Sequence, residues 1–151
     1  MRVLIDADGC PVVKAAVRLC REFSAPCTIL CDTCHVFSDD YADVIVCDKG
    51  SDSVDYKLVN LIRAGDLCIT QDYGLAAMCL SRGAMALHQD GMVYSDDNIG
   101  GLLEARAFSG KVRRSGGRLK GPPKRTEAQN QAFSAALRRI LEEHCGTGRN
   151  L

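Results

Sequence analysis

The chain has 151 residues, of which 46% are hydrophobic and 25% charged. This length suits a single domain with one hydrophobic core. No run approaches the ~18 consecutive apolar residues of a membrane span, and the first ten residues carry two aspartates where a signal peptide would be apolar. The nine cysteines are odd in number, which favours reduced thiols. We therefore expect a cytoplasmic protein that does not associate with membranes.

The two parts of the chain carry opposite charge, although the net charge is zero. Residues 1–100 contain 8 Lys and Arg against 15 Asp and Glu, whereas residues 101–151 contain 11 against 4. Such a separation is typical of a protein that binds cations with one region and a polyanion with another. The alternative is that both charged regions are solvated surface.

Apolar runs alternate with segments of helical periodicity along most of the chain. We expect strands at 2–7, 27–32, 43–47, 66–70 and 84–88. We expect helices at 12–23, 52–64, 73–82, 96–108 and 126–143. Strands that are apolar throughout, each followed by a helix, are typical of a parallel sheet covered on both faces. The pattern therefore predicts an α/β fold with three layers, α/β/α, around a mostly parallel sheet of about five strands.

A basic segment at 109–125 separates the last two predicted helices. It holds seven Lys and Arg residues, no acid, two prolines and several glycines, a composition that predicts a loop. Basic side chains in such a loop can contact the phosphates of a nucleic acid without reading its sequence. We predict this role for Arg113, Arg114, Arg118, Lys120, Lys124 and Arg125. Residues 1–144 then form one domain, followed by a frayed tail at 145–151.

Aspartates follow three of the predicted strands, at the edge where an open parallel sheet binds ligands. The first strand leads to Asp6 and Asp8, the third to Asp52 and Asp55, and the fourth to Asp72. Converging carboxylates repel one another unless a cation neutralises them. Because Mg²⁺ and Mn²⁺ prefer oxygen ligands, either ion is the expected cofactor. Taken singly, each aspartate has a structural alternative, since it could cap a helix or stabilise a turn.

Two hydroxyl residues adjoin these aspartates. Ser51 and Thr70 have the right length to hydrogen-bond a phosphate or to orient a carboxylate. A metal ion held by carboxylates can lower the pKa of bound water and stabilise charge on a phosphodiester. The residues therefore predict a site for a divalent cation with hydroxyl groups beside it.

Four segments resemble the YaiI/YqxD family of bacterial proteins: DADGCPV, CDKGSDSVDYKLV, ITQDYGLAAMCLSRGA and GPPKRT. The resemblance extends from about Arg2 to Glu143. The pattern is in turn similar to the PIN and NYN nuclease-like domains, since TQDYGLA resembles the TxDxxLA motif of PIN ribonucleases and KGSD resembles the KGxD of NYN domains.

This resemblance implies a PIN-like fold and a divalent-metal-dependent nuclease that acts on RNA rather than DNA. Asp6, Asp52 and Asp72 match the aspartates that bind the metal in that superfamily, and we take them as the catalytic residues. Asp8 and Asp55 are candidate additional or water-mediated ligands.

Two alternatives to a nuclease stay open. The first is a PIN-like module that binds nucleic acid or a partner with little catalysis, because only Asp90 lies near the place of the fourth acid of PIN nucleases. The second is a haloacid-dehalogenase-like phosphatase, because DADGC resembles the DxD start of that class, in which one aspartate attacks phosphorus and the other is the acid and base. Cys10, however, stands where that class has Thr or Val.

Overall fold

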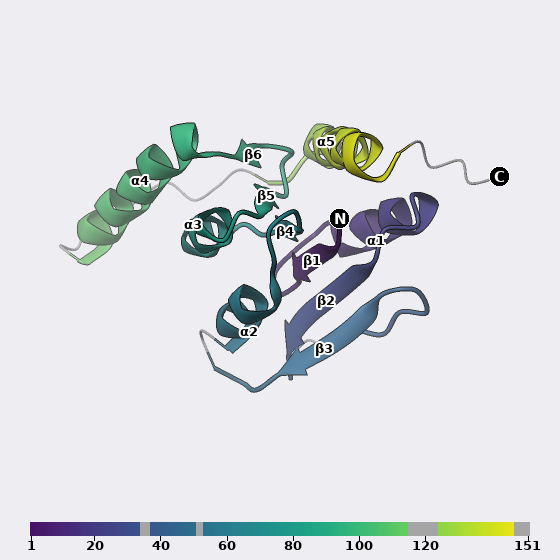
Figure 1. The fold of residues 1–151 in the computed structure, drawn as a ribbon. Coiled ribbons are helices and arrows are strands. Elements are labelled where there is room, and N and C mark those ends of the chain that lie inside the picture. Colours follow the sequence, from purple (N-terminus) through teal and green to yellow (C-terminus); the bar gives the residue numbers. More distant parts are fainter. Residues whose placement is uncertain (34–36, 51–52, 115–123, 147–151) are drawn as a thin grey trace.

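A six-stranded sheet forms the centre of the computed structural model, which describes residues 1–33, 37–50, 53–114 and 124–146 (Figure 1). The strand order is β3-β2-β1-β4-β5-β6, and every pair is parallel except β5 with β6. The strands are β1 (Val3–Asp6), β2 (Cys27–Asp32), β3 (Asp43–Cys47), β4 (Leu67–Ile69), β5 (Met85–Leu87) and β6 (Val93–Tyr94).

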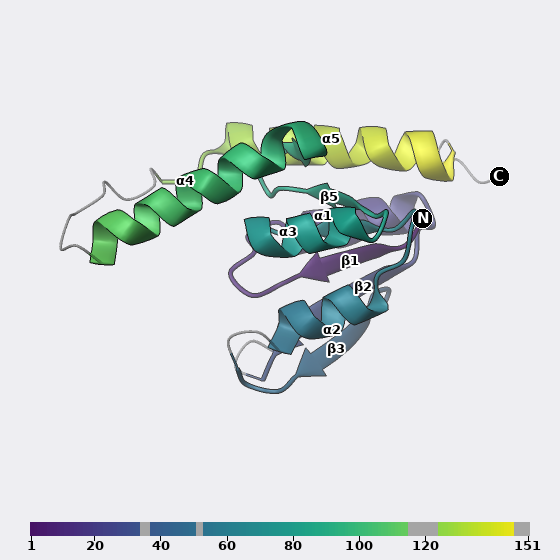
Figure 2. The ribbon, with the colours of Figure 1, turned by 60° about the vertical axis from the view of Figure 1, so that its left-hand side comes forward.

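In the described ranges, five helices accompany the sheet and give it three layers. Helices α1 and α5 lie on one face and α2 and α3 on the other, while α4 packs against α3 (Figures 1 and 2). The predicted α/β class with a mostly parallel sheet is therefore confirmed. The helices are α1 (Val13–Glu22), α2 (Ser53–Leu61), α3 (Tyr73–Ser81), α4 (Asp96–Arg114) and α5 (Glu127–Cys145).

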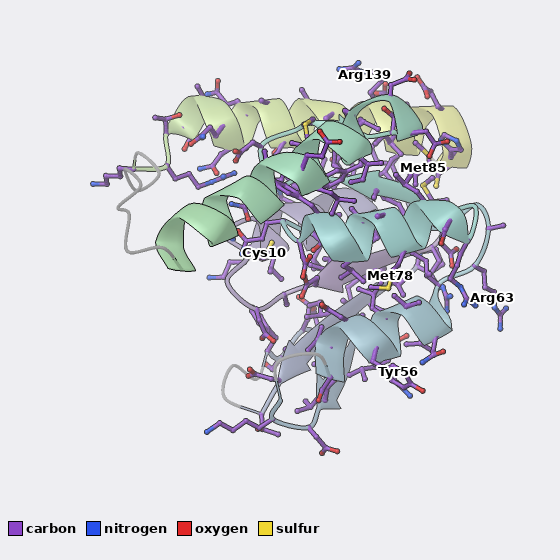
Figure 3. All side chains as sticks on the ribbon, turned by 90° about the vertical axis from the view of Figure 1, so that its left-hand side faces the viewer. Cys10, Tyr56, Arg63, Met78, Met85 and Arg139 are labelled. Carbon is purple, nitrogen blue, oxygen red and sulfur yellow. The ribbon has the colours of Figure 1, made fainter. Side chains whose placement is uncertain are left out.

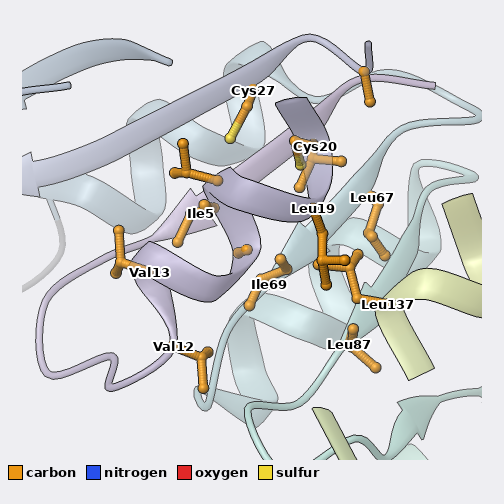
Figure 4. Packing of buried hydrophobic residues seen from close by; sticks show 14 of the residues in the cluster. Ile5, Val12, Val13, Leu19, Cys20, Cys27, Leu67, Ile69, Leu87 and Leu137 are labelled. Carbon is orange, nitrogen blue, oxygen red and sulfur yellow. The ribbon is translucent and has the colours of Figure 1, made fainter. Parts of the chain in front are cut away.

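Alternate residues of each inner strand enter opposite halves of the core. Val3 and Ile5 of β1 pack on the side of α1 and α5, whereas Leu4 packs on the side of α2 and α3. Figure 4 shows the first of these clusters, where Leu19 of α1 and Leu137 of α5 lie near the sheet. Because both faces are covered, the inner strands are mostly apolar, and this is why they were recognisable in the sequence.

The sequence analysis missed strand β6. Its two residues are too few to show an alternating pattern, and a tight turn after β5 brings them back antiparallel, with Ala86 opposite Tyr94. Tyr94 is buried, and its hydroxyl donates to the backbone oxygen of Thr70 (3.2 Å). The short strand therefore holds the backbone at the end of β4 in place, next to the site described in the following subsection.

Helix α4 is longer than predicted, because it ends at Arg114 rather than near residue 108. The loop expected at 109–125 is therefore wrong for residues 109–114, where Lys and Arg favour the helix intrinsically. Residues 115–123 of that segment and most of the tail predicted at 145–151 lie outside the described residues, whereas α5 itself extends to Cys145.

Eight cysteines lie in the described part of the chain, and all eight are free thiols. In the same residues, no helix combines the length and the apolar character that crossing a bilayer requires.

We predict that Gly91→Ala destabilises the protein more than Gly65→Ala. Both glycines have positive φ, +94° and +87°, so alanine is strained at either position. A Cβ at Gly91 would also lie 2.6 Å from the backbone oxygen of Ala132 in α5, whereas Gly65 has no atom within 4 Å. We expect a loss of about 1 kcal/mol for Gly65→Ala and about 2–4 kcal/mol for Gly91→Ala, measured by urea unfolding. Equal losses of unfolding free energy would show that the Ala132 backbone in α5 does not limit the space at Gly91.

Candidate functional site at the carboxyl edge of the sheet

The centre of the site is the junction between β1 and β4. From β1 the chain builds β2 and β3 on one side and then returns to add β4 on the other, so ligands are expected where these two strands end. At this point the Thr70 hydroxyl donates to Oδ2 of Asp6 (2.7 Å) and accepts from the backbone N–H of Asp72 (2.9 Å). Thr70 is buried, so it connects the two predicted catalytic aspartates rigidly.

Asp72 also begins helix α3. Its Oδ1 accepts hydrogen bonds from the backbone N–H groups of Gly74 (2.9 Å) and Leu75 (3.2 Å), which makes it the N-cap. The structural alternative that its position suggested is therefore real. It does not exclude a second role, because the Asp72 carboxylate still acts electrostatically on Asp6.

A pocket of about 420 Å³ adjoins Asp6 on the side of β2 and α2. Asp8 follows β1 and accepts a hydrogen bond at Oδ1 from the backbone N–H of Asp32 (3.2 Å). Lys49 is a cation among the pocket residues. We call this the acidic pocket; its lining residues are Asp6, Asp8, Asp32, Lys49, Gly50, Val54 and Asp55.

The Asp6 carboxyl is a weaker acid than an ordinary aspartate. Burial is the main reason that its pKa is raised to about 6, and the negative charges of Asp72 and Asp8 raise it further. The hydrogen bond from Thr70 opposes these effects because it stabilises the ionised form. The ionised carboxylate is therefore held at an energetic cost that a nearby cation would relieve.

The sites predicted for a metal are brought together in part. Asp6, Asp8 and Asp55 line the acidic pocket and Asp72 lies next to Asp6, whereas Ser51 and Asp52 are outside the described residues. Within the described ranges, no three His, Cys, Asp or Glu side chains form a group that could hold a metal ion. The oxygen-rich lining and the raised pKa of Asp6 nevertheless suit a hard divalent cation.

Sequence reasoning did not select Asp32 or Lys49 as site residues. Asp32 is the last residue of β2, so the same position that identified Asp6 in β1 could have identified it. Lys49 follows β3 in the chain, and only the fold shows that it lines the acidic pocket.

The predicted phosphate-binding residues differ in how the structure places them. Arg113 and Arg114 end helix α4, while Arg118 and Lys120 lie outside the described residues. Lys124 is exposed.

Arg125 is held within the protein. Its Nε donates to Asn130 (2.7 Å), its Nη2 donates to the backbone oxygen of Gln89 (2.8 Å), and it forms an ion pair with Asp90. Asp90 also donates its backbone N–H to Nδ1 of His88 (3.0 Å). The acid nearest to the fourth position of PIN nucleases is thus engaged in anchoring Arg125.

Fold and site together define an α/β protein. Its carboxylate-lined pocket lies beside the end of β1, the strand from which the sheet extends in both directions. Residues 4–143 match the family described as "Uncharacterized BCR, YaiI/YqxD family", and the chain belongs to this family. It is 44% identical over 143 residues to a UPF0178 protein of Clostridium acetobutylicum, which covers 93% of this chain and 97% of the relative. A UPF0178 protein of Exiguobacterium sibiricum is 43% identical over 143 residues, with 95% and 98% covered. No solved structure matches the chain.

We predict that Asp6→Asn removes a loss of stability that the protein suffers as the pH rises. The raised pKa means that the folded state binds the Asp6 proton more tightly than the unfolded state, so ionisation between pH 3.8 and about 6 destabilises the fold. In a chelator at pH 8, Asp6→Asn should increase the free energy of unfolding by about 1–3 kcal/mol, and the gain should disappear near pH 4.

The matched control for this change is Asp43→Asn. Asp43 is exposed and begins β3, at the opposite edge of the sheet. Urea unfolding of the three proteins at several pH values is the measurement. If the free energies of unfolding of wild type and Asp6→Asn depend on pH in the same way, the pKa of Asp6 is not raised in the folded protein.

We predict unequal effects for two adjacent substitutions in the basic segment. Arg125→Ala removes the contacts with Gln89, Asp90 and Asn130 and should lower the free energy of unfolding by about 1–2 kcal/mol. Lys124→Ala, at an exposed position, should change it by less than ~0.5 kcal/mol. Thermal or urea unfolding distinguishes the two, and equal effects would contradict the anchoring role of Arg125.

Proposed function

We propose that this protein is a divalent-metal-dependent nuclease that cleaves RNA phosphodiesters at the acidic pocket. The observation that carries the proposal is the partly buried Asp6 carboxyl at the β1–β4 junction, with its raised pKa, next to Asp72 and Asp8. A group of this kind at a switch point is a functional-site candidate, because a purely structural role would be served by an uncharged residue.

The metal would be held by Asp6, Asp52 and Asp72, with Asp8 and Asp55 as further or water-mediated ligands. Mg²⁺ or Mn²⁺, when bound, would supply Lewis-acid chemistry to a phosphodiester. This assignment rests on the resemblance to PIN and NYN domains together with the oxygen-rich lining of the pocket.

The residues of the chain have distinct parts in such a reaction. The Thr70 hydroxyl fixes the orientation of the Asp6 carboxylate through its hydrogen bond to Oδ2. Lys49 places a positive charge in the pocket, where it can attract a phosphate. Ser51 would hydrogen-bond a phosphate oxygen. Because Asp6 must be ionised to bind a cation, activity should rise with pH up to about 6 and above.

The basic residues would hold the RNA backbone. Lys124 is exposed, so its charge is available to a phosphate that extends beyond the pocket, and Arg113 and Arg114 are the last two residues of α4. Contacts of this kind position a polyanion and make its binding depend on salt. This part of the proposal favours RNA rather than DNA only through the resemblance to PIN ribonucleases.

We predict that Mn²⁺ or Mg²⁺ supports cleavage of labelled single-stranded RNA by the wild type and by Asp43→Asn, but not by Asp6→Asn. The same ions should raise the melting temperature of the first two proteins and leave that of Asp6→Asn almost unchanged, because only a folded cluster binds the ion. Single-turnover cleavage and thermal unfolding, each with metal and with EDTA, are the measurements.

The outcomes separate the proposal from the binding-only alternative. RNA binding without metal-dependent cleavage would favour a binding module. Equal cleavage by Asp6→Asn and Asp43→Asn would contradict the assignment of Asp6, and an absence of both binding and cleavage would overturn the proposed function. A matched single-stranded DNA in the same assay tests the preference for RNA.

A further inference from the structure

Tyr56 is unusually exposed for an aromatic residue in a helix. The side chains of Val54 and Leu58 in α2 face the core, so Tyr56 between them points outward, and it is 74% exposed. In the part of the chain that the structure describes, the other exposed large hydrophobic residues reach at most 44%. Figure 3 shows Tyr56 on α2. Packing within the described protein does not account for this aromatic ring.

The ring borders a pocket of about 340 Å³ between α2 and the edge strand β3. Strand β3 contributes apolar side chains to its lining, Lys57 contributes a positive charge and Asp48 a negative one. We call this the Tyr56 pocket; its lining residues are Ile45, Val46, Cys47, Asp48, Ser53, Tyr56 and Lys57.

The Tyr56 pocket and the acidic pocket are neighbours. In the chain, Asp48 of the one precedes Lys49 of the other, and Asp55 of the acidic pocket precedes Tyr56. Described residues just after β3 and in the first turns of α2 therefore contribute to both pockets. A ligand that spans them would meet carboxylates at one end and an aromatic face with a lysine at the other.

The chemistry of the Tyr56 pocket fits a nucleotide. An exposed aromatic face stacks on a base regardless of its identity, and Lys57 can contact the adjoining phosphate. Stacking requires a base whose face is accessible, and in a duplex both faces of a base are covered by its neighbours. The pocket is also a short distance along the chain from carboxylates that would act on a phosphodiester.

We propose that the Tyr56 pocket receives an unpaired base of single-stranded RNA, next to the phosphodiester at the acidic pocket. This inference rests on the proposed function in that it takes RNA as the ligand, and it specifies the substrate as single-stranded. Tyr56 is then a binding residue for the nucleotide that flanks the reactive bond, and it takes no part in the chemistry at Asp6.

The absence of tryptophan from the chain provides a direct test. In an Asp6→Asn background with EDTA, where RNA is not cleaved, Tyr56→Trp introduces a single tryptophan at the pocket. Its fluorescence should be quenched on titration with a single-stranded RNA oligonucleotide and much less with the same sequence as a duplex. Val93→Trp in the same background is the control, because Val93 is 41% exposed on β6 at the opposite end of the sheet. Its fluorescence should not change.

Affinity measurements complete the test. Tyr56→Ala should weaken the binding of single-stranded RNA by roughly 5- to 100-fold in filter binding, while Tyr56→Phe should stay within about twofold of the parent. RNA binding that leaves the Tyr56→Trp signal and the Tyr56→Ala affinity unchanged would overturn this inference alone. Equal quenching by duplex and single strand would overturn its single-stranded part. A failure of all variants to bind RNA would overturn the inference and the proposed function together.

Discussion

The central position of strand β1 is the constraint on which the site depends. Because β1 pairs with β2 on one side and β4 on the other, Val3, Leu4 and Ile5 are buried, and the chain leaves the sheet at the partly buried Asp6. A carboxyl at that point is partly enclosed by protein before any ligand arrives. The other features of the site follow from this placement. Thr70, which follows β4, donates a hydrogen bond to Asp6. The Tyr94 hydroxyl of β6 in turn donates a hydrogen bond to the backbone oxygen of Thr70.

The surroundings of Asp6 disfavour its ionised form. Burial and the neighbouring carboxylates disfavour ionised Asp6 more than the single hydrogen bond from Thr70 favours it, so the net effect is a raised pKa. A fold selected only for stability would replace Asp6 by an uncharged residue that keeps the same hydrogen bond. The cation that we propose would offset this cost, since a positively charged ligand favours the ionised carboxylate.

Local patterns in the sequence predicted those parts of the molecule that local interactions determine. Most strands are apolar runs, and the helix expected at 126–143 begins as α5 with a capping box formed by Thr126 and Gln129. The aspartates at the strand ends were found in the same way. What the sequence did not indicate depends on lateral neighbours. Asp32 meets Asp8 only because β2 lies beside β1, and β6 exists only because a turn places Tyr94 against β5.

The two oppositely charged parts of the chain meet at one edge of the sheet. Strand β5 runs parallel to β4 and β1, so the turn after it, which contains Asp90, emerges at the same edge as Asp6. The ion pair of Asp90 with Arg125 fixes the end of the basic segment at that turn. Cys10 lies close enough to both regions that Asp6 raises its pKa and Arg125 lowers it, although burial is the main influence. Arg125 is therefore engaged within the protein, by Gln89, Asp90 and Asn130. Between the two oppositely charged parts of the chain, the structure thus forms an ion pair from Asp90 of the acidic part to Arg125, the last residue of the basic segment.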